Sequence, residues 1–295
     1  MRRIGGVTLL EAIVSLAIFG LVVGMATLGV TGALRAQNLN EAIVSSQSRL
    51  RRVSEVFSQD LRSTVLGGVL NVPYVSNDHQ VSFVTLEGGA GDPVVPHDRG
   101  GDSSFEKADN LDLVWGDART DPVSALDGRH ILLVNGQGQA IVLKVTSVQL
   151  QGSGTYNVVH AGCANTIAYT PGRTVTMEAR PVGYRFDASS GTLFMTEGSG
   201  PEVPVAFHLR SVAIRYVYVT DGGRALVRTV PLTDASGAPV RRGTIGADHV
   251  TLQRIGLVVS ASEGAEGRGV ERTVSSDVAV VARGTLVIDR VTACN

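Results

Sequence analysis

The most restrictive feature of the sequence is a run of 23 residues without a charged side chain, from Ala12 to Leu34. Coiled as an α-helix at about 1.5 Å per residue, this run is about 34 Å long, enough to cross a hydrocarbon core of about 30 Å. Arg2 and Arg3 precede the run and Arg35 follows it. Because short cytoplasmic segments are enriched in arginine and lysine, we predict one span in the lipid bilayer, with the N-terminus in the cytoplasm and the bulk of the chain outside.

A carboxylate, that of Glu11, stands at the start of the apolar run. Placing a carboxylate inside a bilayer costs at least ~2.5 kcal/mol, so such a residue normally has a partner or a purpose. A secretory signal fits the run poorly, because its apolar region is shorter and ends in a small-residue cleavage site. A plain signal anchor fits the length, but then Glu11 only marks the membrane boundary. Both readings of Glu11 stay open on these grounds.

The string from Gly5 to Gly20, GGVTLLEAIVSLAIFG, closely resembles the type IV prepilin signature. The resemblance implies that residues 1–6 are a leader, which prepilin peptidase cuts after Gly6 before methylating the new N-terminal amine of Val7. It also implies that Glu11 pairs with that amine on a neighbouring subunit of a filament. Two buried opposite charges offset their desolvation only when they are close, so such a pair would set the register of assembly. Val7 departs from the Phe or Met that often begins the mature chain in this family.

A helical pattern continues beyond the apolar run. Apolar residues recur on one face, and no proline occurs before Pro73. We therefore predict a helix from about Thr8 to about Leu66, stopped by Gly67-Gly68. Its membrane and filament-core part is 7–34, and its amphipathic continuation is 35–68. The apolar face consists of Ile43, Leu50, Val53, Phe57, Leu61 and Val65. The opposite side, predicted to face solvent or other subunits, consists of Arg49, Arg51, Arg52, Glu55, Gln59, Asp60 and Arg62.

Residues 69–295 show short β-branched or alternating runs between glycine-rich turns, which predicts a β-rich antiparallel head and an α+β fold. The segment from Glu87 to Ser104 reads as a long surface loop. The predicted strands are Val81–Leu86, Leu111–Trp115, Ile131–Val134, Ala140–Leu150, Thr174–Ala179, Thr192–Thr196, Val203–Val219, Ala225–Val230, Val250–Ser260 and Val270–Ala282. Hairpin turns are predicted at 135–138, 187–191 and 221–223.

The two cysteines, Cys163 and Cys294, have no His or Cys beside them at metal-ligand spacing, which argues against zinc. If the head lies outside the cytoplasm, a disulfide between them is the natural interpretation. Two unrelated buried thiols are the alternative.

The sequence shows no arrangement typical of an enzyme. The six histidines are scattered singly, and the glycine-rich stretch at 88–92 is followed by Pro93 rather than by a helix that could bind phosphate. The net charge is −1, and acidic residues interrupt the arginines of the helix, so no nucleic-acid site is expected. No cofactor or metal is predicted. The histidines are His79, His97, His130, His160, His208 and His249.

The head resembles, more loosely, the PilW-type minor pilins and the J-type pseudopilins of type II secretion. The likeness rests on Ser48-Arg49-Leu50 through Asp60-Leu61-Arg62, Tyr184-Arg185-Phe186-Asp187 leading to Thr192-Leu193-Phe194, and Val212 to Tyr218. It implies a structural minor pilin that initiates or caps a type IV pilus, at the inner membrane and then at the cell surface. Its partners would be prepilin peptidase, other subunits and the inner-membrane assembly platform. A periplasmic pseudopilin, or an adhesive head exported by the prepilin route, are the alternatives.

Overall fold

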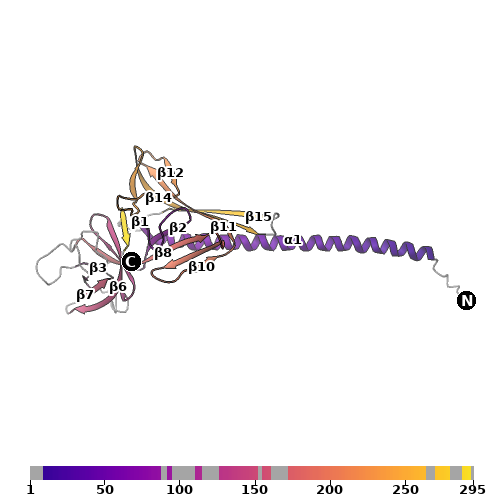
Figure 1. Cartoon of the computed structure of the whole chain (residues 1–295), viewed down its shortest axis with the longest axis horizontal. Coiled ribbons are helices and arrows are strands. Elements are labelled where there is room, and N and C mark those ends of the chain that lie inside the picture. The colour runs from indigo at the N-terminus through magenta and orange to yellow at the C-terminus, as the bar shows by residue number, and fades with distance from the viewer. Residues whose placement is uncertain are drawn as a thin grey trace.

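The computed structural model describes residues 9–87, 92–94, 110–114, 126–151, 155–160, 172–263, 270–279 and 288–293. One long helix, α1 (Leu9–Ser63), lies with its C-terminal half against a β-rich head, while its N-terminal half projects away from the head (Figure 1). At about 1.5 Å per residue, its 55 residues extend about 82 Å. This arrangement confirms the predicted α+β class.

The helix ends at Ser63, and the residues around Leu66, predicted to be its last turn, belong to strand β1 (Thr64–Leu70) instead. The hydroxyls of Ser63 and Thr64 both donate to the carbonyl of Asp60, at 2.7 and 3.1 Å, which satisfies an acceptor that the helix end leaves open. Pairing with a neighbouring strand supplies the backbone bonds that β1 loses by leaving the helix. The glycine pair thus lies inside a strand rather than stopping a helix.

The larger sheet has 11 strands among the described residues, in the order β1-β2-β8-β5-β6-β7-β4, with β3 and β9 on β8, β10 on β9 and β16 on β6. All of its pairs are antiparallel except β16 with β6, which is parallel. Its strands are β1, β2 (Gln80–Leu86), β3 (Asp92–Pro93), β4 (Asn110–Val114), β5 (His130–Val134), β6 (Gln139–Gln151), β7 (Thr155–His160), β8 (Val175–Asp187), β9 (Thr192–Glu197), β10 (Val203–Ala206) and β16 (Arg290–Ala293).

The smaller sheet has five strands, in the order β12-β11-β14-β13, with β15 also on β14. Strands β14 and β15 contact α1 and run alongside it, as Figure 1 shows. The strands are β11 (Leu209–Thr220), β12 (Ala225–Arg228), β13 (Arg242–Ile245), β14 (Asp248–Glu263) and β15 (Val270–Ala279). All three predicted hairpin turns are confirmed, at β5–β6, β8–β9 and β11–β12, and each contains a glycine with φ between 62° and 81°.

Strand β8 is longer than predicted, because it continues past Ala179 through Pro181 to Asp187. Proline normally interrupts a strand because it cannot donate to the ladder. Here β5 pairs with one edge of β8 up to Ala179, and β9 pairs with the same edge from Val182 onward. The missing N–H of Pro181 falls in the gap between these two partners, and its carbonyl accepts the N–H of Gly198 at 2.7 Å. The strand can therefore pass through the proline without losing a bond.

Other strand predictions were incomplete. The predicted strand Val203–Val219 is two strands, β10 and β11, separated at Phe207 and His208, where His208 has a φ of 56°. Residues 92–93, predicted to lie in a loop, pair with β8 as β3. Strands β7, β13 and β16 were not predicted at all. Strand β16 pairs with β6, which lies far away in the sequence, so local pattern carries little of its signal. Strands β7 and β13 are short and form hairpins with the adjacent β6 and β14, and the prediction missed them although their partners are close in sequence.

The larger sheet is covered on both faces around β5. Ile131 and Leu133 lie in one buried apolar cluster, whereas Leu132 and Val134 lie in another, as the alternation of a strand requires. A third cluster joins α1 to strands of both sheets. The helix is thus held by the same core that joins the two sheets.

Candidate assembly interface

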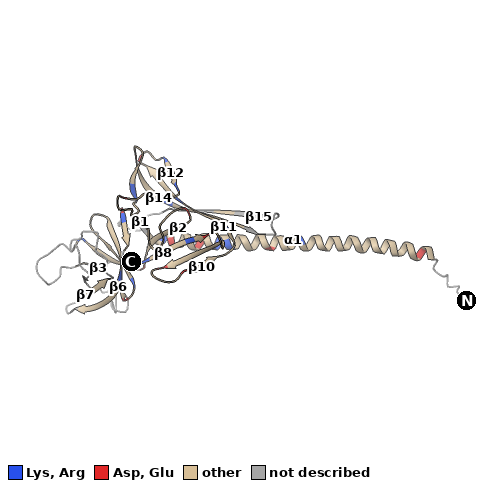
Figure 2. Ribbon diagram, in the orientation of Figure 1, with Lys and Arg blue, Asp and Glu red and all other residues tan. Residues whose placement is uncertain are grey.

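The N-terminal half of α1 is not covered by any other part of the chain that the structure describes. Every residue from Leu9 to Glu41 is exposed, including Leu16 at 75% and Phe19 at 69%. Figure 2 shows the projecting helix almost free of charge after its first turn. Among the described residues this is one helix long and apolar enough to cross a membrane. Such a surface needs lipid or another protein to cover it.

Glu11 lies in the first turn of α1, with its side chain exposed. The N-terminus of a helix carries partial positive charge and unsatisfied N–H groups, so an acid in this turn is favourable. That local role is compatible with pairing to an amine of a neighbouring subunit. Gly6 and Val7, the predicted cleavage and methylation positions, lie outside the described residues.

The C-terminal half of α1 packs its predicted apolar face on the head. Leu50, Val53, Phe57 and Leu61 are at most 2% exposed. The Phe57 ring meets the Tyr184 ring edge to face, with centroids 5.2 Å apart. Such aromatic pairs add about 0.5–1.5 kcal/mol beyond the burial of their area. This face fixes the head to the helix in one register.

Two residues assigned to the solvent-facing side of the helix contact the head instead. The Tyr184 hydroxyl donates to Asp60 Oδ2 at 2.5 Å, and Arg49 Nη1 donates to the Phe207 carbonyl at 3.3 Å. Burial is the main cause that raises the pKa of Asp60, against the hydrogen bond from Tyr184, which lowers it. Burial followed by Asp60 itself raises the pKa of Tyr184. The spacing of apolar residues along the helix could not predict these contacts, because it carries no information on which polar groups of the head lie opposite the helix.

The two cysteines, Cys163 and Cys294, also lie outside the described residues, but the strands that lead to them are described. β7 ends at His160 opposite Val145 of β6, and β16 ends at Ala293 opposite Val142. β5 occupies the other edge of β6 at these positions, so β7 and β16 share one edge. Because β16 is parallel and β7 antiparallel to β6, their C-terminal ends point toward each other.

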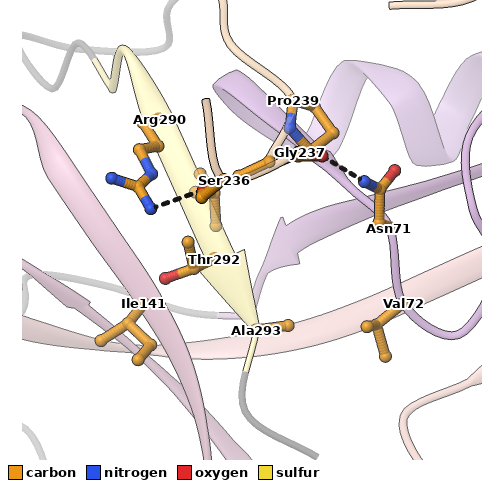
Figure 3. Close-up of a pocket in the computed structure, with 11 residues that line it drawn as sticks. Asn71, Val72, Ile141, Ser236, Gly237, Pro239, Arg290, Thr292 and Ala293 are labelled. Atoms are coloured by element: carbon orange, nitrogen blue, oxygen red, sulfur yellow. Dashed lines mark hydrogen bonds between the residues drawn. The ribbon is translucent and has the colours of Figure 1, made fainter. Parts of the chain in front are cut away.

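A cavity of about 390 Å³ lies where the loop 234–239 of the smaller sheet meets β16 of the larger one (Figure 3). Its polar groups already have partners within the protein. Asn71 Nδ2 donates to the Gly237 carbonyl at 2.8 Å, and Arg290 Nη2 donates to Ser236 Oγ at 3.1 Å. Arg290 also forms an ion pair with Asp234 at 2.9 Å. These bonds tie the two sheets together, so the cavity is a seam rather than a site with unused chemistry.

Within the described part of the chain, no group of three or more His, Cys, Asp or Glu side chains could hold a metal ion. The described histidines lie on different elements. His79 contacts the Val212 carbonyl through Nδ1 at 3.1 Å, and His130 begins β5. His97 lies outside the described residues.

A comparison with known protein families finds a match at the N-terminal end of the chain, where the prepilin-like signature lies. Residues 1–27 match the prokaryotic N-terminal methylation motif. No curated protein and no solved structure matches the chain. The motif and the long apolar helix support a type IV pilin-like or pseudopilin-like protein, membrane-anchored and exported. The motif also implies processing by prepilin peptidase and assembly with other pilins, and it points to a structural rather than an enzymatic role.

Proposed function

We propose that this protein is a minor pilin that initiates or caps the assembly of a type IV pilus. The observation that carries the proposal is the division of α1. Its C-terminal half is locked to a large head, and its N-terminal half, which carries the methylation motif, is exposed along its whole length. A head of more than 200 residues is large for a subunit repeated throughout a thin shaft, but it fits one present in few copies. A J-type pseudopilin of a type II secretion system has the same N-terminal requirements and is the second candidate.

Assembly would follow from the exposed helix. After cleavage between Gly6 and Val7, the methylated amine of Val7 would face Glu11 of a neighbouring subunit in a filament core. One face in the middle of α1 would accept the helix of another subunit, because several of its side chains are small enough to permit close helix approach. This face consists of Ala33, Ala36, Gln37, Asn40, Glu41, Val44, Ser45 and Ser48.

The test is Gly6→Leu in cells that contain the peptidase. The wild-type mature chain should begin at a methylated Val7 by mass spectrometry, and the variant should keep its leader and stay in the membrane fraction. An initiating subunit should be rare beside the main pilin in sheared filaments, and its deletion should reduce the number of filaments. An intact wild-type N-terminus would refute the prepilin route. Presence of the protein only with a secretion machinery would favour the pseudopilin.

We also propose a disulfide between Cys163 and Cys294. It is supported by the facing ends of β7 and β16, which lie three positions apart along β6, from Val142 to Val145. That is about 10 Å at ~3.3 Å per residue, a gap that the residues leading to Cys163 can span. Closing so long a loop stabilises by several kcal/mol, about 4.7 for 100 residues in the chain-entropy account. Denatured, unreduced protein from the cell envelope should contain no reactive thiol; two reactive thiols would rule the bridge out.

A further inference from the structure

An open cleft of about 450 Å³ lies in the larger sheet, at the place where β5 begins and β9 ends on the same edge of β8. Neither strand pairs with β8 at Arg180 and Pro181, so the sheet has a gap there. The cleft is lined by Glu87, Gly128, Arg129, His130, Lys144, Ala179, Arg180, Glu197, Gly198, Ser199 and Gly200. It lies in the head, far along the chain from the helix that carries the assembly motif.

Both carboxylates of the cleft already form ion pairs with the same arginine. Arg180 forms ion pairs with Glu87 at 3.1 Å and with Glu197 at 3.0 Å. Asp60 of α1 adds a third carboxylate in the vicinity of Arg180. Arg129 approaches Glu87 only to 3.8 Å. Arg180 compensates one of the two lining carboxylates, and Arg129 and Lys144 then leave the lining of the cleft with one net positive charge.

The cleft is also lined by His130 and Lys144, which are direct cross-strand partners on β5 and β6. Side chains in this relation have Cβ atoms about 4.5–5.5 Å apart. Neither side chain has a hydrogen bond or an ion pair with another residue that the structure describes. Burial, followed by Lys144, lowers the pKa of His130, so the imidazole is neutral at neutral pH and keeps one N–H to donate. An ammonium and an N–H donor thus converge on one space.

Gly198 lies against the His130 ring in the same cleft. Its φ is 57°, and a Cβ at this position would lie 3.1 Å from the imidazole Cε1. A glycine here keeps the side of the cleft next to the imidazole open, and the neighbouring Ser199 and Gly200 form its rim. Arg129, which directly precedes β5, adds a further donor to the lining.

We propose that this cleft binds a single carboxylate or phosphate group, held between the Lys144 ammonium and the His130 ring with Arg129 at the rim. The charges favour an anion, because the three cations Arg129, Lys144 and Arg180 outnumber the two carboxylates of the lining. A partly enclosed ammonium gains more from an anion than an exposed one does. The site gives the head a ligand-binding capacity that does not depend on filament assembly.

The chain contains two lysines, Lys107 and Lys144, which supplies a matched control. Purified full-length mature protein in detergent should be titrated calorimetrically with inorganic phosphate and, separately, with acetate, at constant ionic strength set by chloride. We expect saturable binding of at least one of the two anions. Lys144→Gln should weaken it at least tenfold, Lys144→Arg should retain it within about threefold, and Lys107→Gln should leave it unchanged.

A second measurement needs no variant. The bound anion should slow the acetylation of Lys144 by an amine-reactive ester and leave that of Lys107 unchanged, as quantified by peptide mass spectrometry. The response of the two anions separates a phosphate site from a carboxylate site. Absence of saturable binding, equal loss in Lys107→Gln, or unprotected Lys144 at saturating anion would each overturn the proposal.

Discussion

Both halves of α1 carry large apolar side chains, but the halves differ in what covers these side chains. In the N-terminal half the large apolar side chains are exposed, whereas in the C-terminal half Leu50 and Phe57 are fully buried against the head. An apolar surface indicates that something covers it, but not whether the cover belongs to the same chain. Burial of the first half therefore contributes to insertion into lipid or to contact with another subunit, whereas burial of the second half stabilises the fold of this chain. Substitutions in the two halves should affect two separate equilibria.

The largest effect is expected for Phe57→Ala, which should lower the free energy of unfolding of the head by about 3–5 kcal/mol, because it empties a buried site between Phe83 and Tyr184. The matched control is Phe19→Ala, whose side chain is 69% exposed, and whose effect should stay within about 0.5 kcal/mol. Denaturant unfolding of the detergent-solubilised protein, followed by tyrosine fluorescence, measures both. Equal destabilisation by the two changes would break the comparison.

Glu11→Gln should weaken the incorporation of the protein into filaments by a free energy similar to that lost in Phe57→Ala. If Glu11 neutralises the amine of Val7 on a neighbouring subunit, its loss leaves a buried charge unpaired at a cost of about 3–5 kcal/mol. That corresponds to roughly two to three and a half decades in incorporation. Blotting sheared filaments against membranes should show normal insertion and processing, poor incorporation, and an unchanged unfolding curve of the head. Equal incorporation would return Glu11 to the role of a membrane-edge residue.

Tyr184→Phe tests the polar contact between the C-terminal end of α1 and the head. It removes the hydroxyl that donates to Asp60 and leaves a partly buried carboxylate without this donor. A loss of about 1–3 kcal/mol in unfolding free energy is expected. Tyr74→Phe, whose hydroxyl bonds the exposed Glu202, is the control and should cost less. A neutral Tyr184→Phe would mean that the aromatic packing alone fixes the register of the helix.

Asp60→Asn should give the smallest effect, and its sign depends on pH. The pKa of Asp60 is raised by burial, so the folded state favours the protonated acid. The stability from this preference is fully present below the unfolded pKa and is lost as pH rises through the folded pKa. The amide still accepts from Tyr184 and carries no charge. The variant should therefore melt slightly above the wild type at pH 7 and approach it near pH 4; a lower melting temperature at pH 7 would show that attraction to Arg180 outweighs burial.

Local signals in the sequence were enough for much of the fold. The uncharged run Ala12–Leu34 and the helical spacing from Leu50 to Leu61 predicted the helix and the face that it buries. Most of the longer strands and all three hairpin turns followed from β-branched runs and glycines. The N-terminal motif predicted the class of protein, since its residues are contiguous. These features share one property: each depends on residues that are neighbours along the chain.

Other features were decided by tertiary structure. Whether Thr64–Leu70 continues a helix or joins a sheet depends on β2, which competes for its backbone bonds. Strand β8 passes through Pro181 only because β5 and β9 leave a gap there, and this gap lies at the cleft that His130 and Lys144 help to line. Asp60 reads as a surface residue until Tyr184 is placed opposite it. The sequence by itself determined that the chain has a membrane helix, a methylation motif, a β-rich head and an apolar helix face for that head to cover. The tertiary structure decided where the helix ends, which strands pair and where polar groups meet, because those energies arise between groups whose contacts only the folded chain brings together.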